Sequence, residues 1–156
     1  MSVRLPPFQA LLDAHRAEVL RFCMALVGPQ DAEDCFQETF LAALRAYPKL
    51  RDASNLRAWL LTIAHRKAMD HHRGRARGAT PMETVPDRAS APGPEPEPAL
   101  WEAVRALPPK QRTAIVARYV GDLSYREVAS ISGGTEEAAR RNAADGLANL
   151  REAWSR

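Results

Sequence analysis

The sequence predicts an all-α protein made of two small helical domains joined by a Pro-rich linker, the second containing a helix-turn-helix. Apolar residues recur at three- and four-residue steps along several segments, which is the spacing of a helix with one buried face. No segment alternates apolar and polar residues as a strand does. Half of the 12 prolines fall between Gly78 and Pro98, where the apolar periodicity disappears, and this indicates a semi-extended linker.

This linker divides the chain into residues 1–77, a linker of residues 78–98, and residues 99–156. The 156 residues, with 46% hydrophobic and 26% charged side chains, are typical of a folded soluble protein. A formal net charge of +3 permits a polyanionic partner without requiring one. The sequence shows neither a membrane-spanning stretch nor a signal-peptide core, so we expect a cytoplasmic protein with no membrane partner.

Three helices are expected before the linker. The first opens at Pro6-Pro7 and ends at Gly28-Pro29, the second runs from about Gln30 to Tyr47, and the third from Asn55 to about Arg75. Their predicted core faces consist of Phe8, Leu11, Leu12, Val19, Phe22, Cys23 and Leu26, then Phe36, Phe40, Ala43, Leu44 and Tyr47, then Leu56, Trp59, Leu60, Ile63 and Ala64.

The second and third helices carry opposite charges. The second begins with Asp31, Glu33, Asp34 and Glu38, and the helix dipole accounts for the first two but poorly for Glu38. The end of the third holds Arg66, Lys67, Arg73, Arg75 and Arg77 against the single acid Asp70. Cations suit a helix C-terminus, but so many of them, with three histidines, also predict a surface that contacts phosphates.

The C-terminal domain is predicted to end in a helix-turn-helix. Ser124 and Glu127 have the spacing of a capping box, a short helix breaks at Gly133-Gly134, and Thr135 can cap a longer helix. An ordinary αα-hairpin gives the same pattern, so the pattern alone leaves both interpretations open. The predicted core residues of this domain are Leu100, Trp101, Val104, Leu107, Ile115, Val116, Tyr119, Val120, Ala139, Ala143, Leu147, Leu150 and Trp154.

The residues that catalysis needs are absent from the sequence. There is no glycine-rich phosphate loop and no nucleophile motif, and His71 and His72 are adjacent and therefore point apart on a helix. We expect no catalytic residue, no metal site and no cofactor. Cys23 and Cys35 are expected to be buried free thiols, although a disulfide between them stays open. These absences favour a binding protein over an enzyme.

Three segments, in order, resemble the extracytoplasmic-function (ECF) subfamily of bacterial RNA polymerase sigma factors: Asp31 to Leu44, Leu56 to Arg75, and Ala106 to Gly133. The resemblance implies a subunit that binds RNA polymerase core, recognises a promoter and helps to open the DNA. It also implies contacts with the clamp helices of the largest polymerase subunit and, through the second domain, with the flap region. Members of the family are commonly held by an anti-sigma factor.

The resemblance assigns roles to particular residues. The positions that match the polymerase-docking helix are Asp34, Gln37, Glu38 and Phe40, with Leu41 as an added apolar contact. This role accounts for Glu38, because acids and amides suit an Arg-rich partner helix. The candidates for contact with the −10 element, beside the loop of residues 49–55, are Trp59, Arg66, Lys67, Asp70, His71, Arg73, Arg75 and Arg77. Trp59 also fits a core position, and Arg66 stands where an asparagine is frequent.

The second domain is expected to read the −35 element. Its candidates are Arg126, Thr135, Arg140, Arg141 and Asn142, with Arg112 as a further phosphate contact. Here the chain departs from the family, because Glu136, Glu137 and Asp145 replace residues that are usually not acidic. Acids repel phosphates, which predicts either unusual specificity or weak affinity for the upstream element.

Two other functions fit part of the pattern. A stand-alone helix-turn-helix regulator would bind duplex DNA without polymerase, and a protein-interaction module would sequester another transcription factor. The acidic second helix discriminates among them, because only docking on polymerase requires it.

Overall fold

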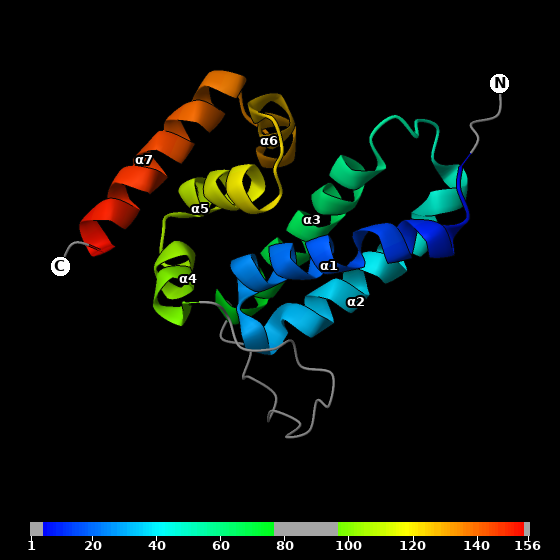
Figure 1. The fold of residues 1–156 in the computed structure, drawn as a ribbon, viewed down its shortest axis with the longest axis horizontal. Coiled ribbons are helices and arrows are strands. Elements are labelled where there is room, and N and C mark those ends of the chain that lie inside the picture. The colour runs from blue at the N-terminus through cyan, green and yellow to red at the C-terminus, as the bar shows by residue number, and fades with distance from the viewer. Residues whose placement is uncertain (1–4, 77–96, 155–156) are drawn as a thin grey trace.

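The computed structural model describes residues 5–76 and 97–154, and within these residues it confirms the predicted all-α class, with no strand. The N-terminal unit comprises α1 (Phe8–Val27), α2 (Pro29–Ala46), the 3-10 turn η1 (Tyr47–Lys49) and α3 (Leu56–Ala76). The C-terminal unit comprises α4 (Pro98–Arg105), α5 (Pro109–Ile115), the π-helical turn η2 (Val116–Val120), α6 (Tyr125–Ser132) and α7 (Glu136–Trp154). Figure 1 shows the two units side by side. Most of the predicted linker, residues 78–96, lies outside the described residues.

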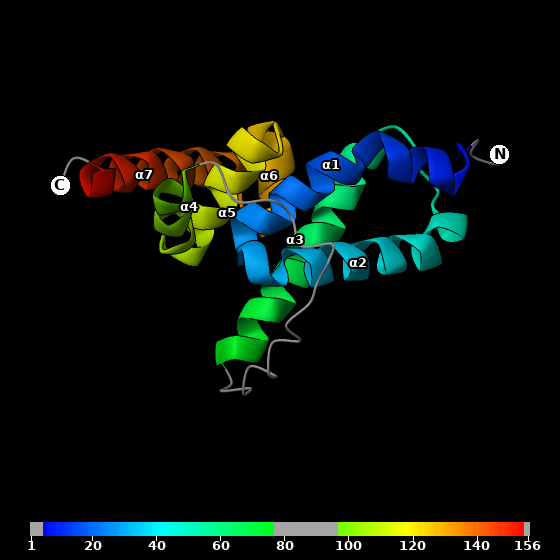
Figure 2. The ribbon, with the colours of Figure 1, turned by 60° about the horizontal axis from the view of Figure 1, so that its bottom comes forward.

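The N-terminal unit is a bundle in which each helix packs on the other two. Gly28, with φ of 88°, turns the chain from α1 directly into Pro29 at the first position of α2. Asn55 caps α3 by accepting a hydrogen bond from the Ala58 amide at 3.0 Å. The core of the bundle is fully buried at Phe22, Leu26, Leu60 and Leu61, among others. Figure 2 shows the C-terminal part of α3 projecting beyond the layer of the other helices.

The predicted helix-turn-helix elements are confirmed in the C-terminal unit. The Ser124 hydroxyl accepts a hydrogen bond from the Glu127 amide at 3.2 Å, and the Glu127 carboxylate accepts one from the Ser124 amide at 2.9 Å. Gly133, with φ of 79°, ends α6 in the left-handed conformation. Thr135 Oγ1 then caps α7 by accepting from the Ala138 amide at 3.0 Å.

Three residues predicted to be in the core are exposed instead. Leu44 on α2 is 50% exposed, Tyr119 on η2 is 55% exposed and Trp154 at the end of α7 is 54% exposed. Each lies at the edge of an apolar stripe that is wider than the surface buried against it. The predicted helical periodicity is therefore correct, but the predicted core face is too wide. Leu107, just after the end of α4, is buried as predicted.

The two units pack against one another, with α1 and α3 of the first touching α4, η2 and α6 of the second. Gly121 after η2 lies in the apolar part of this contact, where a Cβ would be 3.3 Å from Leu61 and 3.4 Å from Phe22. None of the described helices is both long and apolar enough to cross a bilayer.

Candidate functional site

One side of α2 exposes apolar side chains next to an acidic one. Gln37 and Glu38 are exposed, as are Leu41 (54%) and Leu44 (50%) on the following turn. We call Gln37, Glu38, Leu41 and Leu44 the α2 face. Asp34, one turn before it, is half-buried. Sequence reasoning missed Leu44, although its spacing of three from Leu41 was a usable signal.

Phe40 does not belong to this exposed surface. It is only 7% exposed and its ring packs against Phe8 and Phe36, at centroid distances of 6.3 Å and 4.9 Å. The prediction of Phe40 as a polymerase contact is therefore corrected, because its side chain is occupied in the core. It supports the α2 face from beneath.

The basic end of α3 presents cations to solvent. Arg66 and Arg73 are exposed and Lys67 is half-buried, while Arg73 forms an ion pair with Asp70 one turn away. His71 Nε2 lies 3.1 Å from Glu38 Oε2, so this helix meets the α2 face directly. The Arg75 side chain and Arg77 lie outside the described residues.

Trp59 is half-buried near the start of α3. Its ring lies 6.2 Å from that of Tyr47, at an interplanar angle of 39°. This placement fits the core role that the sequence left open, because a ring that stacks on a base needs an exposed face.

The three histidines of α3 have three separate partners. His65 contacts Thr113 Oγ1 at 3.1 Å, His71 contacts Glu38, and His72 donates to the Leu26 carbonyl at 2.9 Å. The described residues hold no group of three His, Cys, Asp or Glu side chains that could bind a metal ion. Burial, followed by the nearby Arg112 cation, lowers the pKa of His65 to about 4, so this imidazole is neutral at pH 7.

Cys23 and Cys35 are both fully buried free thiols, as predicted. A hydrogen bond with Cys35, and then burial, raises the pKa of the Cys23 thiol well above its usual value. A thiol with so little thiolate is unreactive at neutral pH, which fits a packing role.

The helix-turn-helix exposes most of its predicted DNA contacts. Arg126, Thr135, Arg140 and Arg141 are exposed, and Asn142 is half-buried. Arg140 is held by its neighbours, because one of its nitrogens donates to Glu136 Oε1 at 2.7 Å and its guanidinium lies 5.3 Å from the Tyr125 ring centroid.

Arg112 does not contribute to this surface. It is 9% exposed and donates to the Arg105 carbonyl at 2.9 Å, and its Nε has no partner among the described residues. The prediction of a phosphate contact at Arg112 is therefore wrong. A cation at the edge of an apolar helix is expected to be exposed, but the packing of α5 against neighbouring elements buries Arg112.

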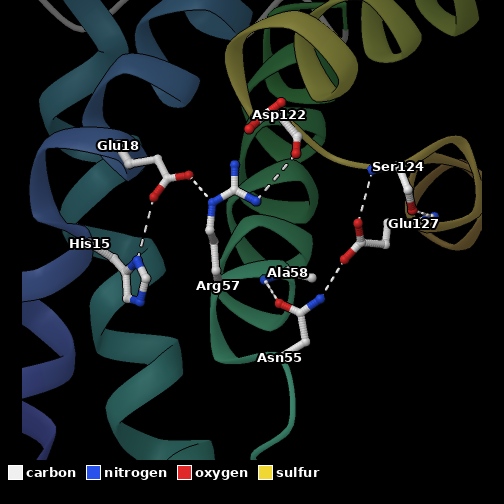
Figure 3. Close-up of polar contacts among 8 residues, drawn as sticks. All are labelled: His15, Glu18, Asn55, Arg57, Ala58, Asp122, Ser124 and Glu127. Carbon is white, nitrogen blue, oxygen red and sulfur yellow. Dashed lines mark hydrogen bonds and ion pairs between the residues drawn. The ribbon is translucent and has the colours of Figure 1, made fainter.

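Polar side chains join the two units beside the apolar seam (Figure 3). Arg57 on α3 forms an ion pair with Glu18 on α1 and donates to the Asp122 carbonyl at 3.5 Å. Asn55 donates to the Glu127 carboxylate on α6. Glu18 holds Arg57 from within the N-terminal unit. We call Arg57, Asn55 and Glu127, with the Asp122 carbonyl, the inter-unit clasp. Sequence reasoning did not find it, because the partners are distant in sequence and each is an ordinary surface residue.

A groove of about 390 Å³ lies between α4, η2 and α7 in the C-terminal unit. Its apolar lining includes Trp101, Leu147 and Leu150, together with Tyr119 and Trp154, the two exposed aromatics of this unit. Tyr119 and Trp154 are therefore exposed for the same reason, because both rings line this open groove.

Known proteins match this chain along most of its length. Residues 11–78 match the family Sigma-70 region 2, and residues 98–150 match Sigma-70, region 4. The ECF RNA polymerase sigma factor SigD of Mycobacterium tuberculosis (strain ATCC 25618 / H37Rv) is 37% identical over 145 residues, which cover 83% of this chain and 68% of SigD. The RNA polymerase sigma factor CarQ of Myxococcus xanthus is 30% identical over 155 residues, which cover 93% of this chain and 87% of CarQ.

A solved structure shares the fold. It is the sigma factor RpoE in complex with the anti-sigma factor NepR from Bartonella quintana, with a TM-score of 0.77, 24% identity, and coverage of 95% of this chain and 96% of that one. At this identity the likeness concerns the fold alone.

A region 2 match followed by a region 4 match defines the class as an RNA polymerase sigma factor of the sigma-70 type. The chain belongs to the ECF sigma factors, as the resemblance of its three motifs predicted. It binds RNA polymerase core, directs the enzyme to specific promoters and assists promoter melting. The family match favours this function over a stand-alone helix-turn-helix regulator.

Proposed function

We propose that this sigma factor is a non-enzymatic, cytoplasmic subunit in which residues 1–77 bind polymerase and the −10 element and residues 99–156 bind the −35 element. Residues 78–98 act as the linker between them. The exposure of Leu41 and Leu44 beside Glu38 carries the proposal, because exposed leucines next to an acid are typical of a protein-docking surface.

The α2 face, with Asp34, binds the clamp helices of the largest polymerase subunit. Carboxylates at positions 34 and 38 pair with arginines of the partner, and the leucines bury apolar area at the centre of the contact. Phe40 of α2 packs against Phe8 of α1 and against Phe36, and this anchoring of α2 on the bundle lowers the entropy lost on docking.

The end of α3 and the loop of residues 49–55 bind the −10 element. Arg66, Lys67 and Arg73 contact the phosphates, with Arg75 and Arg77 continuing the charge along the sequence. The projection of α3 beyond the bundle lets a DNA strand pass along it without meeting α1 (Figure 2). Capture of an unstacked base then assists melting, because cations hold the backbone on either side of it.

The C-terminal unit contributes two further surfaces. The start of α7 enters the major groove of the −35 element, where Arg140, Arg141 and Asn142 reach base edges. The groove lined by Trp101, Tyr119 and Trp154 takes an apolar helix, and the flap region of polymerase supplies it. An anti-sigma factor that held this chain would compete for these surfaces or for the α2 face.

Promoter binding by both units requires the inter-unit clasp to open. The −10 and −35 elements lie about 25 base pairs apart, or roughly 85 Å at ~3.4 Å per pair. In the closed arrangement Asn55, which caps α3, donates a hydrogen bond to Glu127 of α6, so the two units are held directly against one another. Residues 77–96 can span at most roughly 70 Å when extended, which is enough, with the two units themselves, to cover the distance.

The test is run-off transcription with RNA polymerase core across a genomic promoter library, with and without the chain. We expect new start sites that share an upstream and a −10 sequence, and weaker selection of the upstream sequence by Arg140→Ala with Arg141→Ala. A chain that binds duplex DNA equally well without polymerase, and adds no start sites, contradicts the proposal and supports the regulator.

A further inference from the structure

The acidic start of α7 has a structural consequence that the family pattern does not predict. Glu136 and Glu137 are neighbours at the N-terminus of the helix and both are exposed, but they behave differently. Glu136 accepts a hydrogen bond from Arg140 at 2.7 Å, one helical turn away, whereas Glu137 forms no ion pair in the described part of the chain.

Arg140 is also held from a second helix. Its guanidinium carbon lies 5.3 Å from the ring centroid of Tyr125, the first residue of α6. Arg118 lies 4.9 Å from the same ring and is fixed by a hydrogen bond to the Leu123 carbonyl at 3.0 Å. Two guanidinium groups, those of Arg118 and Arg140, thus lie within cation–π distance of the Tyr125 ring. Arg140 is held both by the Glu136 carboxylate and by this ring.

This arrangement suits an arginine that reads a base. A free arginine side chain loses several rotatable bonds when it binds, and fixing it beforehand removes part of that entropy loss. A guanidinium has five N–H donors, so a bond to Glu136 leaves enough of them for a bidentate contact with O6 and N7 of a guanine. The carboxylate at the same time weakens attraction to phosphates of any sequence, which favours specific over non-specific binding.

We infer that Glu136 and Tyr125 are positioning residues that orient Arg140 toward a guanine of the −35 element. The acidic helix start therefore increases base selectivity at the expense of general DNA affinity. This inference rests on the proposed role of α7 as the upstream-element reader.

The test compares Glu136→Gln with Glu137→Gln in the full chain bound to polymerase core. Both variants remove one negative charge from the same helix terminus, so both should raise non-specific duplex binding equally. Each holoenzyme selects from promoters whose −35 region is randomised, and the base preference at every position is read by sequencing. Melting temperatures of the free variants report any change in folding.

We expect the wild type and Glu137→Gln to prefer guanine at one upstream position. In Glu136→Gln the ratio of guanine to the other bases at that position should be roughly tenfold lower. Tyr125→Phe, which keeps the ring face, should retain the preference, and Tyr125→Leu should lose it. Equal preferences in Glu136→Gln and Glu137→Gln overturn the inference while leaving the function intact. A wild-type holoenzyme that selects no upstream sequence overturns the reading role of α7 as well.

Discussion

Replacing Arg57 with glutamate should separate the two helical units. Two interactions of Arg57 reach the C-terminal unit, a hydrogen bond to the Asp122 carbonyl at 3.5 Å and an electrostatic attraction to the Glu127 carboxylate. Its ion pair with Glu18 lies within the N-terminal unit. Loss of the bond to the Asp122 carbonyl and of the attraction to Glu127, with a new repulsion between the carboxylates at positions 57 and 127, weakens the closed arrangement by about 1 kcal/mol. That free energy corresponds to a roughly fivefold larger separated fraction.

Thiol labelling measures this fraction directly. Thr113 is only 4% exposed and contacts His65 across the inter-unit seam, so Thr113→Cys places a reporter that reacts when the units part. Label at position 113, located by mass spectrometry, should accumulate about fivefold faster in the Arg57→Glu background. Arg21→Glu, an exposed position on α1 with the same charge change, is the control and should leave the rate unchanged.

The charge-swapped pair Glu18→Arg with Arg57→Glu restores the ion pair within the N-terminal unit but neither contact of Arg57 with the C-terminal unit, so position 113 should still label at the faster rate. Equal labelling rates in Arg57→Glu, Arg21→Glu and the unaltered background would refute the view that the clasp holds the units together.

Three further predictions concern stability. Because the pKa of His65 is about 4 in the folded chain and near its ordinary 6.5 when unfolded, the unfolded chain binds more protons between these values. Stability should therefore fall by roughly 2 kcal/mol from pH 7 to pH 5 in urea titrations, and His65→Asn should remove that slope. Gly146→Ala places a Cβ 2.7 Å from Ile115 and should lower the free energy of unfolding by about 1–2 kcal/mol, seen as a lower melting temperature. The control Gly134→Ala, whose nearest atom is 3.9 Å away, should change it little. Ser124→Ala should destabilise by about 1 kcal/mol in thermal unfolding, because it removes the α6 cap.

The sequence predicted the helices well because their signals are local. The bounds of α1, α2 and α3 follow from prolines, Gly28 and the Asn55 cap, all of which act within a few residues. The capping box at Ser124 and Glu127 is likewise complete within one turn, so its geometry could be read from spacing alone.

Features that depend on tertiary packing could not be read in the same way. Phe40 and Leu44 are four residues apart on one helix, yet one is buried and the other is exposed, because α1 covers only part of the apolar stripe. Arg112 is a second example, because no local signal in the sequence shows that this side chain packs inward. The clasp bonds, from Asn55 to Glu127 and from Arg57 to the Asp122 carbonyl, join residues far apart in the chain, and no pattern in either segment predicts them.

We expect the α2 face to bind RNA polymerase, and co-purification of the chain with polymerase core measures this binding. Asp34→Arg with Glu38→Arg reverses its charge, and Leu41→Asp with Leu44→Asp changes only exposed side chains, so the second pair spares the core. Asp13→Arg with Glu102→Arg, two exposed acids elsewhere, gives the same charge change as the first pair and serves as control. We predict that both α2 pairs reduce the polymerase-bound fraction at least about tenfold while the control binds normally and all three variants keep the helical circular-dichroism spectrum. Unchanged co-purification of both α2 pairs would show that polymerase binds elsewhere on the chain.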